Sequence, residues 1–74
     1  MGYNGHRNWN HWNVSLWLNN DEGLYRAMME HIRCARTLDR AARRFMSELE
    51  GCETPDEAPY SYTTVRAAMR GARA

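Results

Sequence analysis

The segment from Trp9 to Tyr25 constrains the fold more than any other part of the chain, because it holds all three tryptophans and four asparagines within seventeen residues. A tryptophan must bury its bulk while its indole N–H keeps a hydrogen-bond acceptor. Three such side chains so close together predict an aromatic core with asparagine side chains as polar partners. No catalytic or metal-binding motif has this pattern.

The chain length of 74 residues allows one domain. A domain of this size buries only about 60% of the surface of its unfolded chain, which leaves no room for a deep substrate cleft beside a core. We therefore expect a single helical domain over residues 1–74 that binds a partner and is not an enzyme. The sequence predicts no catalytic residue and no cofactor.

Apolar residues recur at helical spacing along most of the chain, which predicts an all-α fold of three to four short helices in one compact domain. Residues 9–19 also fit a strand, but Asn8 can cap a helix there, and we favour the helix. Asn20 or Asp21 is expected to cap a second helix of three to four turns. Thr37 then caps a third helix, which Gly51 ends.

The two remaining parts of the chain are less regular. Residues 1–8 form a loose N-terminal arm, and residues 51–60 form an acidic loop that contains two prolines. Within that loop, Thr54-Pro55-Asp56-Glu57 has the order of a capping box with Pro at the first helical position. The pair Thr63-Thr64 is expected to cap a final helix, which frays from Gly71.

Cysteine usage and hydropathy predict a reduced, cytoplasmic protein. The N-terminus lacks the apolar segment of a secretory signal, and the longest apolar runs are too short for a transmembrane helix. Cys34 is then expected to be a small buried residue and Cys52 a loop thiol. His31 and Cys34 are one helical turn apart, but a second pair of ligands is missing, so we predict no metal site and interpret His31 as a surface or boundary histidine.

The net charge of +1 conceals two strongly charged segments, since residues 26–46 carry +4 and residues 47–59 carry −5. An acidic segment is complementary to a basic groove on another protein, and neighbouring tyrosines supply interface anchors. The alternatives are a solvated loop and a tyrosine that packs on the core. The candidate partner-binding residues are Glu48, Glu50, Glu53, Asp56, Glu57, Tyr60 and Tyr62.

The arginines provide an alternative basic face, because several recur at three- and four-residue spacing and would form stripes able to engage phosphates. Its candidate residues are Arg33, Arg36, Arg40, Arg43, Arg44, Arg66 and Arg70. The competing interpretation is a solvated face on which Glu30, Asp39 and Glu48 pair locally with arginines. We favour that interpretation because nucleic-acid-binding domains usually have a larger basic excess.

Two segments resemble a family of small proteins from bacteriophages, prophages and plasmids. The first is Tyr3-Asn4-Gly5 with the run from Trp12 to Tyr25, in which His6 replaces a tryptophan that is common in the family. The second is Thr54-Pro55-Asp56, where Glu57 follows in place of the more usual glycine.

This resemblance implies an anti-CRISPR protein that evades host defence. Such a protein binds a type I surveillance complex (Cascade) stoichiometrically and blocks target DNA binding or nuclease recruitment. The resemblance makes the acidic segment with Tyr60 and Tyr62 the docking face. A small Arg-rich phage nucleic-acid-binding regulator is the second hypothesis, and an enzyme accessory subunit is the third. The protein is expected to be a monomer or a homodimer, and exposure of Met28, Met29 or Trp17 would favour the dimer.

Overall fold

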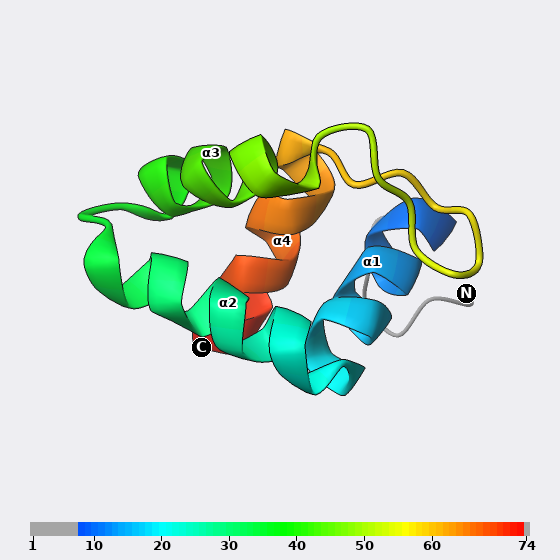
Figure 1. The fold of residues 1–74 in the computed structure, drawn as a ribbon, viewed down its shortest axis with the longest axis horizontal. Coiled ribbons are helices and arrows are strands. Elements are labelled where there is room, and N and C mark those ends of the chain that lie inside the picture. The colour runs from blue at the N-terminus through cyan, green and yellow to red at the C-terminus, as the bar shows by residue number, and fades with distance from the viewer. Residues whose placement is uncertain (1–7, 74) are drawn as a thin grey trace.

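Four α-helices make up the fold of the part of the chain that the structure describes (Figure 1). The computed structural model describes residues 8–73, with α1 over Trp9–Asn20, α2 over Glu22–Cys34, α3 over Leu38–Leu49 and α4 over Tyr62–Arg73. Within this part of the chain the only extended pairing is an isolated antiparallel bridge between Glu53 and Pro59. The predicted all-α fold is confirmed. The predicted loose arm lies outside the described residues except for Asn8.

The first three helices begin where the local sequence predicts. The side chains of Asn8, Asp21 and Thr37 accept hydrogen bonds from the backbone N–H three residues later, at 3.0, 3.0 and 3.1 Å. Each such cap stabilises a helix by about 1 kcal/mol. The Asn8 cap belongs to α1, so residues 9–19 form the helix and not the strand.

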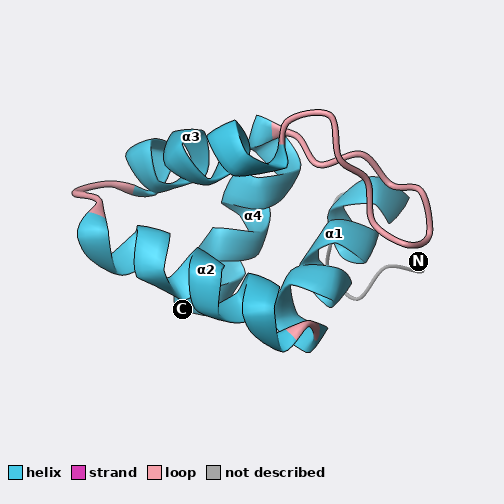
Figure 2. Cartoon of the chain, viewed as in Figure 1, coloured by secondary structure: helices cyan, strands magenta, loops and turns pink. Residues whose placement is uncertain are grey.

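The α1–α2 and α2–α3 junctions are short, whereas residues 50–61 form a long connection between α3 and α4 (Figure 2). Asp21 is the single residue between α1 and α2. Its N–H donates to the Trp17 carbonyl at the end of α1, at 3.0 Å, and its side chain caps α2. Gly51 follows the end of α3 with φ of 80°, a conformation that favours glycine, as predicted.

The start of α4 differs from the prediction. Ser61, and not Thr63 or Thr64, caps this helix, because the Ser61 Oγ accepts from the Thr64 N–H at 3.2 Å. The Thr64 Oγ1 accepts in turn from the Ser61 N–H at 2.9 Å, so the two residues cap each other. The helix then continues through Gly71 to Arg73.

The core lies where α4 packs against the three other helices, between α2 and α3 in Figure 1. All four helices and the acidic loop contribute to it, and Phe45 is its largest fully buried side chain, only 1% exposed. The buried apolar residues are Val14, Leu18, Met28, Ala41, Ala42, Phe45, Leu49, Ala58, Tyr60, Val65, Ala68 and Met69.

The predicted tryptophan core is wrong. Trp9 is 38% exposed, and Trp12 and Trp17 are half-buried. The inward face of α1 is a narrow stripe that is occupied by Val14 and Leu18, four residues apart. The larger indole rings therefore lie at the edges of this stripe. Exposure of Met28, Met29 or Trp17 would have favoured a homodimer. Met28 is buried, and Met29 and Trp17 are half-buried.

Candidate functional site

The acidic loop folds back on itself between α3 and α4 (Figure 2). The Thr54 N–H donates to the Ala58 carbonyl at 2.9 Å, and the Tyr60 N–H donates to the Cys52 carbonyl at 3.3 Å. No helix starts at Thr54, so the predicted capping box is wrong. The Thr54 hydroxyl is buried and is used in contacts with α1 and with the Ala58 N–H.

Helix α1 holds this loop through four side chains, Asn13, Trp17, Thr54 and Asp56, which we call the α1–loop clasp. The Asn13 amide is buried, donates to the Asp56 Oδ2 at 2.9 Å and accepts from the Thr54 Oγ1 at 2.6 Å. The Trp17 Nε1 donates to the same Asp56 oxygen at 3.0 Å. The indole therefore finds its acceptor in a distant carboxylate and not in a nearby asparagine.

The clasp also favours the ionised form of Asp56. Hydrogen bonds from Asn13 and then from Trp17 hold the pKa of the Asp56 carboxyl below its usual value. Asp56 is exposed and accepts from neutral donors, so it keeps its negative charge while it holds the loop to α1. The clasp joins the two segments that carry the family resemblance, which gives them a shared structural role.

Among the other predicted partner-binding residues, three glutamates and Tyr60 differ in exposure. Glu50, Glu53 and Glu57 are exposed and form no ion pair with another described residue. Tyr60 packs in the core, and its burial raises the pKa of its hydroxyl. The structure thus leaves three glutamates directed at solvent, which we call the outward glutamates.

Glu48 and His31 form a pair that ties α3 to α2. The His31 Nε2 lies 3.0 Å from the Glu48 Oε2, and the His31 ring lies 5.1 Å from the Phe45 ring between centroids. His31 is only 9% exposed, so it is a buried histidine and not the surface or boundary residue expected. Its Nδ1 has no hydrogen-bond partner. Glu48 therefore contributes to folding as well as to surface charge.

Glu57 has a left-handed backbone with φ of 71°. This conformation costs a side-chain-bearing residue about 1–2 kcal/mol, which explains why glycine suits the position. Glu57→Gly relieves this backbone cost, but glycine also loses more conformational entropy on folding. The net effect is expected to be an increase of about 0.5–1 kcal/mol in the free energy of unfolding. Thermal melts followed by circular dichroism should show an increase of roughly 2–8 °C.

Glu53→Gly is the matched control, because it removes the same side chain and charge from a position without positive φ. We expect that variant to melt below the wild type, since glycine adds freedom to the unfolded chain there without relieving strain. If the two variants shifted the melting temperature in the same direction, the conformational explanation for Glu57 would be wrong.

The predicted basic face is only partly assembled. Arg33 pairs with Glu30, and the Arg66 Nε binds the Asp39 Oδ1 at 2.8 Å. Arg70 is exposed on α4. The remaining four arginines surround the α2–α3 connection and the first half of α3, and we call them the basic corner: Arg36, Arg40, Arg43 and Arg44.

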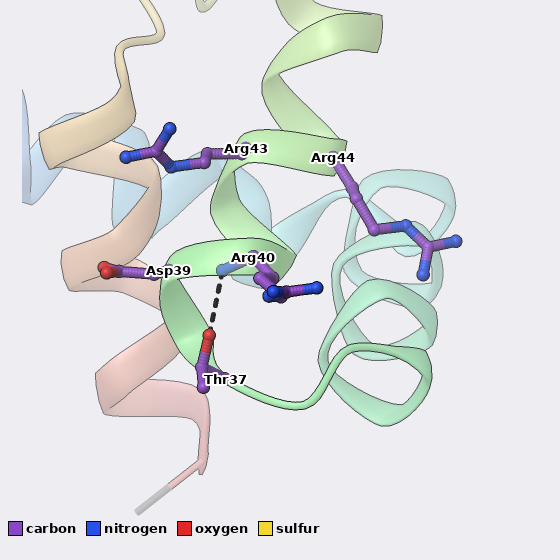
Figure 3. Close-up of a pocket in the computed structure, with 5 residues that line it drawn as sticks. All are labelled: Thr37, Asp39, Arg40, Arg43 and Arg44. Atoms are coloured by element: carbon purple, nitrogen blue, oxygen red, sulfur yellow. Dashed lines mark hydrogen bonds between the residues drawn. The ribbon is translucent and has the colours of Figure 1, made fainter.

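An open hollow of about 550 Å³ lies at the basic corner, lined by Thr37, Asp39, Arg40, Arg43 and Arg44 (Figure 3). Among the described residues that line it, Asp39 is the one carboxylate, and the Tyr62 hydroxyl and Arg66 both donate to it. These bonds lower the pKa of Asp39. The Arg43 guanidinium lies 5.6 Å from the centre of the Tyr62 ring. Tyr62 therefore belongs to the α3–α4 contact and is not a free anchor beside the acidic loop.

Neither cysteine matches a reactive or buried site. Both are exposed and unbridged, so the expectation that Cys34 is buried is wrong. Its thiol donates to the Glu30 carboxylate at 3.2 Å, and this bond raises the pKa of Cys34 and disfavours the nucleophilic thiolate.

The described residues hold neither a metal-binding cluster nor a membrane-spanning helix. Within residues 8–73, no three His, Cys, Asp or Glu side chains gather as a metal site. None of the helices in the same part of the chain has the length and apolar character needed to cross a bilayer.

Comparison with known proteins gives one family. Residues 1–70 match the model of DUF7249, described as a family of unknown function. The comparisons with curated proteins and with solved structures gave no match.

Proposed function

The chain belongs to the DUF7249 family, and from this premise we propose that it is a non-enzymatic inhibitor that binds a basic protein surface through its acidic loop. The observation that carries the proposal is the combination of three unpaired outward glutamates with a loop fixed to α1 by the clasp. A loop that is already ordered loses little entropy on binding, so its charges are presented at low cost.

An exposed aromatic residue accompanies these charges. Trp9 is 38% exposed and lies one helical turn before Asn13, on the α1 face that meets the loop. Tryptophan is enriched among residues that dominate interface energy, whereas isolated charges mainly set association rate and partner choice. We assign Trp9 the anchoring role that the sequence suggested for Tyr60. The sequence did not suggest this role for Trp9, because the tryptophan-rich segment predicted a buried aromatic core.

The family resemblance supplies the proposed target, a type I CRISPR surveillance complex. The channel that holds target DNA in such a complex must be basic, because it binds a phosphate backbone. An acidic protein end can occupy such a channel, or the docking surface of the recruited nuclease, without any chemical step. Inhibition would then be stoichiometric.

The test is a mobility-shift titration with a purified type I surveillance complex and its labelled target duplex. We expect the protein to abolish the shift caused by the complex at near-equimolar amounts. The variant Glu50→Gln/Glu53→Gln should need roughly tenfold more protein, because it loses two of the charges that steer association. Trp9→Ala should need roughly thirtyfold more if it removes about 2 kcal/mol of binding energy.

Glu22→Gln is the matched control, since Glu22 is an exposed glutamate on α2, ion-paired with Arg26 and outside the loop. It should inhibit like the wild type. Equal inhibition by wild type, Glu50→Gln/Glu53→Gln and Trp9→Ala would exclude this docking face. Absence of inhibition by the wild-type protein would exclude the surveillance complex as the target.

A further inference from the structure

We infer that the basic corner is a second binding surface, independent of the acidic loop, and that its ligand is the phosphate backbone of duplex DNA. Arg36, Arg40 and Arg44 are exposed and form no ion pair with a described carboxylate. Arg43 is exposed as well, its guanidinium lies over the Tyr62 ring, and its charge also acts on Asp39. By contrast, Arg26, Arg33 and Arg66 each bind an acid.

The acids that would neutralise this surface are already occupied. Asp39 accepts from Tyr62 and Arg66 of α4, and its side chain points away from Arg44 in Figure 3. Glu30 is bonded to Arg33 and Cys34. The basic corner therefore keeps its positive potential although the whole chain carries only +1.

The arrangement of the guanidinium groups favours an extended polyanion over a single small anion. In Figure 3 the Arg43 and Arg44 side chains leave α3 on opposite sides, with Arg40 between them. Groups that diverge in this way cannot converge on one phosphate. They can each meet a different phosphate of a backbone that carries one charge about every 3.4 Å along each strand.

The absence of a stacking platform favours a duplex over a single strand. Single-strand sites usually combine cations with exposed aromatic rings on which bases stack. No aromatic side chain is among the described residues that line the hollow, and the nearby Tyr62 ring lies under Arg43. Contacts limited to phosphates give binding without sequence preference.

The two charged ends are well separated in the molecule. In Figure 1 the α2–α3 connection lies at the left end of the long axis and the acidic loop lies at the right. The long axis of the described chain is 34 Å, several times the distance over which salt screens exposed charges, roughly 10 Å. The glutamates of the loop therefore do not prevent a duplex from approaching the basic corner.

The experiment is fluorescence anisotropy of a labelled duplex of about 20 base pairs with the full-length protein, between about 50 and 200 mM salt. Four phosphate contacts predict that the logarithm of the binding constant falls with the logarithm of salt with a slope of about −3 to −4. Arg40→Gln/Arg44→Gln should bring the slope to about −2 and weaken binding at least tenfold at low salt. Arg26→Gln/Arg70→Gln removes two charges elsewhere and should leave the slope nearly unchanged.

Three results would overturn the inference. Equal losses in the two double variants would mean that only net charge matters. Tighter binding to a single strand of the same length, or equal competition by poly-glutamate, would mean that the surface serves another ligand. The proposed inhibition is tested separately, because Arg40→Gln/Arg44→Gln should still inhibit the surveillance complex while Glu50→Gln/Glu53→Gln should still bind the duplex.

Discussion

Asn13→Ala is expected to lower the free energy of unfolding by about 2–3 kcal/mol, because it removes the central member of the α1–loop clasp. The amide is 1% exposed and joins Thr54 to Asp56. Without it, the buried Thr54 hydroxyl loses its acceptor and a small cavity remains. Thermal melts followed by circular dichroism should show a decrease of roughly 10–20 °C for a domain of this size.

Asn19→Ala is the matched control, because Asn19 lies on the same helix but is exposed and bonds only to Ser15 within α1. It should change the free energy of unfolding by less than about 0.5 kcal/mol. If Asn13→Ala were as mild as Asn19→Ala, the clasp would not be what holds the acidic loop.

The pH dependence of Asn13→Ala gives an independent readout. The folded protein holds the pKa of Asp56 below its usual value of 3.8, so this group stabilises the fold above that pH, and the contribution is lost as the pH falls through the folded pKa. The variant removes the largest cause of the shift. The pKa of Asp56, measured by NMR titration, should return toward 3.8, and the acid sensitivity of stability below about pH 4 should decrease.

Phe45→Ala is expected to have the largest effect on stability, a loss of about 3–5 kcal/mol. Phe45 is the largest fully buried side chain among the described residues and contacts the His31 ring, whose Nδ1 is already without a partner. A chain of this length is stable by only about 4–11 kcal/mol, so the variant should be close to unfolding at room temperature. Urea titration monitored by helical circular dichroism measures the loss.

Phe45→Leu keeps most of the volume and should cost less than about 1.5 kcal/mol. The difference between the two variants isolates the cavity from the change of residue type. If both unfolded at the same urea concentration, the packing around Phe45 would not be the main support of the core.

The sequence predicted those parts of the fold that depend on neighbouring residues. Asn8, Asp21 and Thr37 cap helices as expected, because the acceptor side chain and the donor N–H are three residues apart. The apolar spacing of α2 and α3 was informative for the same reason. Such contacts are readable from a local pattern.

The remaining features depend on partners far along the chain. Trp17 and Asn13 bind Asp56 across 39 and 43 residues, so no local pattern identified the carboxylate as their acceptor. The same contact gives Asp56 a structural role in addition to its charge. Tyr60 and Tyr62 were ambiguous in sequence, since burial and hydrogen bonding to Asp39 become visible only when α3 and α4 pack together.

The single-residue junction at Asp21 limits how this family can change in length. One residue with φ of −89° and ψ of 117° separates α1 from α2. Each residue added within α1 between Trp17 and this junction would rotate the preceding part of the helix by about 100° about its axis. Asn13 would then face away from Thr54, and the acidic loop would lose its attachment. Insertions and deletions should therefore accumulate elsewhere, and the spacing from Asn13 to Asp21 should persist while the surrounding sequence diverges.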